Sequence, residues 1–444
     1  MKISNFKFQI SNFKRFLLLL TAYCLLPTVV HAEEKTITLA EASNLAIANY
    51  ESVKLSEEDL HQAGDAIDKA ISQMLPNITA NGNYTKYSGS KTSGGFNVQP
   101  ENNSSFDVTL TQPLYSGGKE WSLWRQAKKT TESGRYGLDA AKEGVVINVS
   151  HLYYNVLKAE KTVEIKEAAL KRAAEQRRVA GARFQVGDVT KAVVLRAEAD
   201  VAGAEADLAN AKKDLVVAKD KLTRFLGVSE NFKVANPNIQ PIPDASLDKL
   251  VPLSLEKRRD YIQSKISEDI ADEAISYAKG NFLPSLKLQA VYSQRDQSPK
   301  TTFFNDESIY GGITLTYPLF EGGLRKAELD EAKSKRRQAE FKRISLRKDI
   351  EVAVKEAFHN LETYASIIES FKRQVSFAEE NYNMVFKQFT YGLATNVDVI
   401  DANTTLVSSQ SNLSNAQYDY QIAILELKKS VGILLEDMMM GKGN

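Results

Sequence analysis

The stretch Pro113-Leu114-Tyr115-Ser116-Gly117-Gly118 returns 205 residues later as Pro318-Leu319-Phe320-Glu321-Gly322-Gly323. The same offset places Phe184-Gln185-Val186-Gly187 on Phe389-Thr390-Tyr391-Gly392. A long internal repeat dictates the fold, because each copy is one structural unit that the other must complete. Each copy predicts the same order: a helix, two short strands and a very long helical hairpin.

Residues 1–32 are typical of a secretory signal peptide. Four basic residues precede an apolar run over residues 16–30, and Val30-His31-Ala32 is a suitable cleavage site. The alternative is a retained membrane helix, but the run is about 15 residues long and a span needs about 20. Cys24, the single cysteine of the chain, lies in this segment. The mature chain would therefore have no disulfide and no thiol chemistry.

The charge pattern disfavours a nucleic-acid partner. The formal net charge is +1 for 57 basic and 56 acidic residues, and it becomes −3 without the four basic residues of the predicted signal. Charges of both signs are interspersed, so no basic patch is predicted. No later segment has about 20 consecutive apolar residues. A membrane contact of this secreted chain would therefore use strands.

Heptad spacing of apolar residues predicts the helical hairpins. In the second copy, seams run from Ala357 to Phe389 and, after a break at Tyr391-Gly392, from Val399 to Leu427. Such a seam keeps one narrow apolar stripe against a partner helix. The first copy repeats it from Leu152 to Phe184 and from Val194 to Leu222, with interruptions at Lys166 and Arg177.

The hairpins are predicted to turn at glycines. Gly187 and Gly392 permit the positive φ that a tight helical turn requires, and Thr190 and Thr395 occupy N-cap positions. No proline or glycine lies between Gly323 and Phe389, so this helix would be about 100 Å long. A helix of that length is too long for a small globular domain.

Four segments alternate with period 2 and predict strands at 78–87, 106–115, 286–293 and 309–319. Each is close to the 9–11 residues that a tilted strand needs to cross a bilayer. Alternation alone equally permits a soluble antiparallel sheet with one face on a core. However, four strands cannot close a barrel, lipid does not tolerate open edges, and the rest of the chain offers no cover for an apolar face. Closure by several copies of the chain solves both problems.

The order of elements, the two Pro-Leu-aromatic-x-Gly-Gly stretches and the run from Tyr391 to Ala402 resemble the TolC-type outer-membrane efflux proteins, over residues 38–436. The resemblance implies an α+β membrane protein that forms a homotrimer. Its 12-stranded transmembrane β-barrel would take four strands from each chain and continue as a 12-helix α-barrel across the periplasm. The implied function is an exit duct in outer-membrane lipid for drug efflux or type I secretion.

The resemblance also implies partners and site residues. A periplasmic adaptor and an inner-membrane pump of RND, ABC or MFS type would dock at the hairpin tips, here Val186, Gly187, Asp188, Tyr391, Gly392 and Leu393. Asp398 and Asp401 match the two acidic residues that line the family's entrance, where threefold repetition makes rings that attract cations. Thr395 and Asp398 equally fit a capping box.

The entrance departs from the family's pattern elsewhere. Positions that hold a Tyr, an Arg and an Asp in relatives are Phe389, Ala394 and Val193 here, so that polar latch is not predicted. Arg196 is the repeat mate of Asp401, and we expect the two to pair across neighbouring hairpins.

The predicted organisation has a first repeat over 33–230, a non-helical linker over 231–251, a second repeat over 252–436 and a flexible tail over 437–444. No phosphate-binding glycine loop, nucleophile elbow or histidine pair of metal-binding spacing is present, so neither an enzyme, a cofactor nor a metal site is predicted. The alternative function is a periplasmic coiled-coil adaptor without a pore, although adaptors use one hairpin. The sequence does not identify the cargo or the partner pump.

Overall fold

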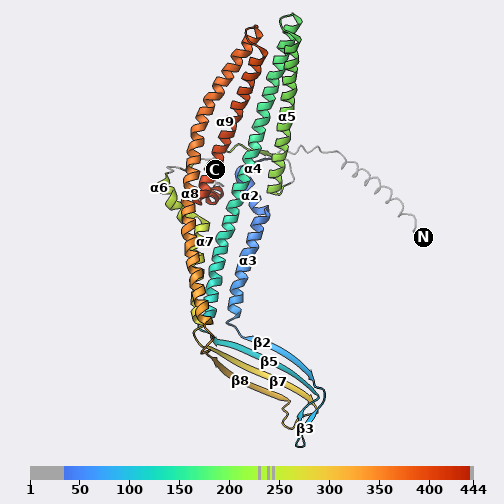
Figure 1. Cartoon of the computed structure of the whole chain (residues 1–444), viewed down its shortest axis with the longest axis vertical. Coiled ribbons are helices and arrows are strands. Elements are labelled where there is room, and N and C mark those ends of the chain that lie inside the picture. Colours follow the sequence, from blue (N-terminus) through green and yellow to red (C-terminus); the bar gives the residue numbers. More distant parts are fainter. Residues whose placement is uncertain (1–34, 229–231, 238–240, 243–245, 441–444) are drawn as a thin grey trace, which may run out of the picture.

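The computed structural model describes residues 35–228, 232–237, 241–242 and 246–440. The predicted signal peptide lies outside these residues. The chain is an elongated column, with a sheet at one end and two helical hairpin tips at the other (Figure 1). Two helices of equal length, α4 (Lys119–Gln185) and α8 (Leu324–Thr390), each have 67 residues and span about 100 Å.

Shorter helices return from the tips along these two long ones. Helix α5 (Lys191–Leu226) packs on α4, and α9 (Asn396–Val431) packs on both α8 and α4. All predicted seam positions are buried or half-buried except Phe184, which is 41% exposed. No described helix is both long enough and apolar enough to cross a membrane.

The two interruptions of the first seam are ion pairs between α4 and α5. Lys166 Nζ lies 2.7 Å from Asp207 Oδ2, and Arg177 Nε lies 3.9 Å from Glu198 Oε1. At these positions charged pairs join the same two helices that apolar contacts join elsewhere. The interruptions of the apolar seam are therefore charged contacts within one continuous helix.

Each returning helix is continued toward the sheet by a second helix. Helix α3 (Glu51–Ser72) extends the column of α5, and α7 (Arg259–Gly280) extends that of α9. Gly432 ends α9 with φ +83°, and a Cβ there would lie 2.9 Å from the Arg258 backbone at the start of α7. The four columns lie in the order α5/α3, α4, α9/α7, α8 (Figure 1).

A belt of short elements lies against the middle of the column. Strand β1 (Lys35–Ile37) pairs in parallel with β6 (Phe232–Val234), beside α2 (Leu39–Asn49). The Tyr153 hydroxyl of α4 donates to the backbone oxygens of Ile37 and Ala235, both at 2.7 Å. The belt is therefore held against one face of α4.

Two predictions for this region were wrong. The linker 231–251 is not wholly non-helical, because α6 (Leu247–Lys257) begins within it and packs Leu250 against α8. The tail 437–444 is helical as far as it is described, as part of α10 (Leu434–Met440). Leu434 and Leu435 are buried and Lys428 Nζ lies 2.7 Å from Asp437 Oδ2, which fixes α10 on the belt.

The sheet has four antiparallel strands in the order β2–β5–β7–β8. They are β2 (Asn77–Lys86), β5 (Asn102–Tyr115), β7 (Ser285–Ser298) and β8 (Glu307–Thr316). Strands β5 and β7 extend beyond the predicted ranges into polar sequence, because backbone pairing continues after the apolar alternation stops. Strand β8 ends before the predicted residue 319, near Pro318, which has no N–H to donate.

Register places the alternating apolar residues on one face. Ile78 pairs with Leu110, Val108 with Tyr292 and Leu288 with Ile313. Cross-strand partners lie on the same side of a sheet. The opposite face carries polar pairs, such as Asp107 with Ser293. A small hairpin of β3 (Lys91–Ser93) and β4 (Phe96–Gln99) forms between β2 and β5, where no strand is predicted.

Candidate functional site

The hairpin tips are two exposed turns at the end of the column away from the sheet (Figure 1). Gly187 and Gly392 adopt φ +79° and +78°, and Thr190 and Thr395 are the N-caps of the helices that follow. Val186 and Leu393 are each 80% exposed and Tyr391 is 72% exposed. Each tip thus presents apolar side chains to solvent that the chain itself does not cover.

Asp398 lies in the first turn of α9 and closes a capping box. Its Oδ2 accepts from the Thr395 hydroxyl at 2.7 Å and from the Thr395 backbone N–H at 2.8 Å. The Thr395 hydroxyl in turn accepts from the Asp398 N–H at 3.3 Å. These hydrogen bonds lower the pKa of the Asp398 carboxyl, which is exposed. The carboxylate therefore carries negative charge while it caps the helix.

Asp401 is exposed one turn further along α9. Arg196 is exposed at the matching position of α5, and within the described residues of one chain neither side chain makes an ion pair. The predicted Arg196–Asp401 pair is therefore not formed between the two hairpins of one chain, and a pair with another copy of the chain stays a prediction.

The three positions that lack the family's polar residues join an apolar cluster. Phe389 is 1% exposed and packs in it, with Val193 and Ala394 against its edge. The cluster takes residues from all four helices of the two hairpins. At these positions apolar packing holds the hairpins of one chain together.

Sequence reasoning missed three polar side chains of α4 that reach the second hairpin. Arg172, Gln176 and Arg183 donate to Asn403, Asn396 and the backbone oxygen of Phe389. Gln176 lies beside Arg177, which interrupts the seam, and it is buried against α9 although no apolar pattern marks its position. The sequence alone therefore offered no signal for this contact.

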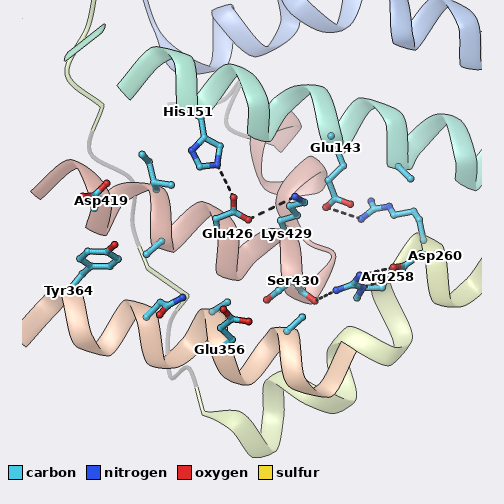
Figure 2. A pocket seen from close by; sticks show the side chains of 18 of the residues that line it. Glu143, His151, Arg258, Asp260, Glu356, Tyr364, Asp419, Glu426, Lys429 and Ser430 are labelled. Atoms are coloured by element: carbon cyan, nitrogen blue, oxygen red, sulfur yellow. Dashed lines mark hydrogen bonds and ion pairs between the residues drawn. The ribbon is translucent and has the colours of Figure 1, made fainter. Parts of the chain in front are cut away.

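A cavity of about 750 Å³ lies at mid-column, between α4, α9, α8 and the start of α7 (Figure 2). His151 Nε2 lies 2.8 Å from Glu426 Oε1, and this hydrogen bond lowers the pKa of Glu426. Burial raises the pKa of Glu143, whose Oε1 lies 3.8 Å from Arg259 Nη1. Acidic and basic side chains both line this cavity. The described residues contain no cluster of three metal-ligating side chains.

The cavity opens on the face of α4 away from the belt. His151, Asn155 and Lys158 line it, whereas Val149 and Tyr153 point to the belt core. At 100° per residue the two sets lie on roughly opposite sides of the helix.

This chain is similar to known proteins in sequence and in fold. Residues 42–228 and 250–433 match the family described as outer membrane efflux protein. The chain is 26% identical over 435 residues to the outer membrane protein TolC of Escherichia coli (strain K12), covering 92% of this chain and 86% of that protein. It is 27% identical over 451 residues to TolC of Vibrio cholerae serotype O1 (strain ATCC 39315 / El Tor Inaba N16961), covering 94% and 97%.

The fold is shared with a solved structure of CusC, with a TM-score of 0.78 and 16% identity over 89% of this chain and 92% of that chain. None of these three relatives is a periplasmic adaptor, so the alternative function gains no support. The fold, with its duplicated hairpins and four-stranded sheet, is TolC-like. The matched segments cover most of the sequence, and the chain belongs to the outer membrane efflux protein family.

Proposed function

We propose that three copies of this chain assemble into one continuous duct, whose periplasmic entrance is lined by Asp398 and Asp401. As a member of its family, the chain is an outer-membrane protein and the exit duct of an efflux or secretion system. The duct conducts passively, while an inner-membrane pump supplies the energy. The incomplete sheet of one chain is the observation that supports assembly of several chains.

The sheet is incomplete in one chain. Strands β2 and β8 each lack a neighbour on their outer side within the described residues, and the apolar face is exposed, with Ile78 at 68%, Ile309 at 77% and Ile313 at 66%. Neither water nor lipid suits this arrangement, since unpaired edges are unfavourable in lipid and a bare apolar face is unfavourable in water. Pairing β8 of one chain with β2 of the next satisfies both edges.

The helical part can close in the same way as the sheet. Each chain supplies an arc of four columns, so three chains make twelve strands and a ring of twelve helical columns. The polar face of the sheet then faces a lumen, which twelve strands leave open. Asp398 and Asp401 become two rings of carboxylates, and Arg196 meets Asp401 of a neighbouring chain.

The tips are the proposed docking sites for a periplasmic adaptor, which connects the duct to the pump. Val186, Tyr391 and Leu393 offer exposed apolar surface, and tyrosine is one of the residue types that contribute most to the affinity of interfaces. Export would then depend on the tips, whereas ion conduction by the isolated duct would not.

The assembly is tested with purified full-length protein in detergent and in planar bilayers. We expect the mass of a trimer and ion channels with a preference for cations. Asp398→Asn with Asp401→Asn should reduce that preference, because two rings of negative charge disappear. Glu380→Gln, which removes an exposed carboxylate of α8, is the control. A stable monomer without channel activity contradicts the proposal.

Two further variants test the entrance and the tips separately. Arg196→Ser should raise single-channel conductance, because the link between chains is lost. Val186→Asp with Leu393→Asp should abolish export in cells and leave conductance unchanged. Export that survives the tip variants excludes docking at this surface.

A further inference from the structure

Two side chains of α4, Arg172 and Gln176, form hydrogen bonds with asparagines of α9 that flank Asp398 and Asp401 in the sequence. The Arg172 Nε donates to Asn403 Oδ1 at 2.6 Å, and the Gln176 Nε2 donates to Asn396 Oδ1 at 2.8 Å. Asn396 lies two residues before Asp398, and Asn403 lies two residues after Asp401. We call these two hydrogen-bonded pairs the α4 ladder.

The ladder is enclosed in the apolar cluster that joins the hairpins. Gln176 is 1% exposed, Asn396 5% and Asn403 9%. The Arg172 guanidinium also lies over the Tyr382 ring of α8, 5.5 Å from its centroid. A buried amide that loses its partner costs about 1–3 kcal/mol, so the pairing strongly favours one placement of α9 against α4.

The ladder and the acidic pair occupy opposite sides of α9. Asn396 and Asn403 are seven residues apart and share one face, which α4 covers. At 100° per residue, Asp398 and Asp401 lie roughly half a turn away from them, and both are exposed. Rotation of α9 about its own axis would therefore move the carboxylates directly away from where they now point.

Arg183 fixes the neighbouring tip. Its Nη1 donates to the Phe389 backbone oxygen at 2.7 Å, and its Nε lies 2.6 Å from Asp188 Oδ2. The guanidinium also lies 5.1 Å from the centroid of the Phe389 ring. The end of α8 is thus tied to the first hairpin, so the second hairpin is held on both sides of its turn.

We propose that Arg172 and Gln176 are positioning residues for the entrance, because they set the rotation of α9 and so aim Asp398 and Asp401 at the lumen. This inference rests on the proposed role of the two aspartates. It assigns the aim of the entrance carboxylates to contacts between α4 and α9 of one chain. Loss of the ladder leaves the carboxylates in the chain but turns them away from the ion path.

The test compares full-length variants in planar bilayers under a salt gradient. Gln176→Leu and Arg172→Met should each lower the cation-to-anion permeability ratio at least twofold and raise conductance. Arg178→Met is the matched control, because Arg178 is exposed on the same helix and pairs with Glu175 of that helix at 2.7 Å. Gln176→Asn combined with Asn396→Gln keeps both amides and should restore the ratio.

A purely structural role would lower the melting temperature and leave the permeability ratio unchanged, and that result overturns the proposal. Spin labels at Lys171→Cys and Thr404→Cys, in chains diluted with unlabelled protein, give a second measurement. The distance distribution should broaden with Gln176→Leu, and an unchanged distribution also overturns the proposal. If the wild type does not conduct, the proposed function fails, while the label distances still decide the ladder.

Discussion

The two hairpins have equal lengths but opposite places in the column. The long helix of the first repeat, α4, buries 19 residues, whereas its counterpart α8 buries 8. The returning helices reverse this order, since α9 buries 15 residues and α5 buries 5. Helices α4 and α9 are interior columns, while α5 and α8 are the two edges of the arc.

The same heptad pattern therefore occurs in two environments, the interior and the edge of the arc. The edge helices keep apolar side chains that no part of their own chain covers, including Val216 at 57% exposure on α5 and Phe377 at 69% on α8. In the proposed trimer these edges meet those of neighbouring chains. The interior pair, α4 and α9, carries the contacts that hold one chain together.

Truncation of matched seam residues tests this difference most strongly. Leu406 of α9 is 2% exposed, and its repeat mate on α5, Val201, is half-buried. Leu406→Ala should reduce the free energy of unfolding by about 2–5 kcal/mol, because it leaves a cavity in the cluster that joins the hairpins. Val201→Ala should cost about 1 kcal/mol. Thermal unfolding of both purified variants, followed by circular dichroism, measures the two effects.

The prediction requires the interior and edge columns to differ in the assembled protein as well. A loss from Val201→Ala well above 1 kcal/mol, close to that from Leu406→Ala, would show that assembly buries Val201 fully. The edge would then be as tightly packed as the interior.

The helix starts after the two tips offer a smaller effect. Thr395 and Asp398 form a capping box on α9, whereas Thr190 makes no side-chain cap bond on α5. Thr395→Ala should cost about 1 kcal/mol and speed hydrogen exchange in the first turn of α9, while Thr190→Ala should change little. Comparable effects at both tips would contradict the difference.

The capping box of Thr395 and Asp398 also predicts how the stability of the first turn of α9 depends on pH. The pKa of Asp398 is lowered by its hydrogen bonds from Thr395. Its contribution to stability is therefore fully present above the ordinary pKa of a carboxyl and is lost as pH falls through the lower folded-state pKa. Protection of the first turn of α9 should persist at pH 5 and weaken only in stronger acid, as measured by hydrogen exchange.

The sequence predicts the repetitive parts of the fold because their physics is local. Heptad seams such as Ala357 to Phe389 identify the long helices, and the two tip glycines mark the turns. The belt could not be predicted in the same way. Helix α10 is short and its apolar residues, such as Leu434, find their partners on α4 and α2, far away in sequence.

For a related reason, the sequence offers a local signal for only some residues near the tips. Asp398 and Asp401 follow a recognisable tip, but Gln176 and Asn396 have no local pattern that joins them. Arg172 and Gln176 lie beside the seam positions of α4, so the heptad pattern says nothing about their partners. Only the packing of α4 on α9 brings them to Asn403 and Asn396.

The smallest predicted effect concerns a buried acidic residue of the interior helix α4. Its repeat mate on the edge helix α8 is an exposed basic residue. Glu143 is 9% exposed and close to Arg259, whereas its repeat mate on α8, Lys348, is exposed. Burial raises the pKa of Glu143. The folded chain thus binds this proton more tightly than the unfolded chain, and stability is lost as pH rises from the ordinary carboxyl pKa toward the raised one.

Glutamine cannot ionise, so Glu143→Gln removes that loss. The difference in melting temperature between the variant and the wild type should therefore become more positive between pH 4 and pH 7, by a few degrees at most. Lys348→Gln is the control, since it introduces the same residue at the exposed matching position of α8. A difference that falls with rising pH would mean that Arg259, which is 8% exposed, stabilises the ionised carboxylate by more than burial destabilises it. The interior column would then be held by charge as well as by packing.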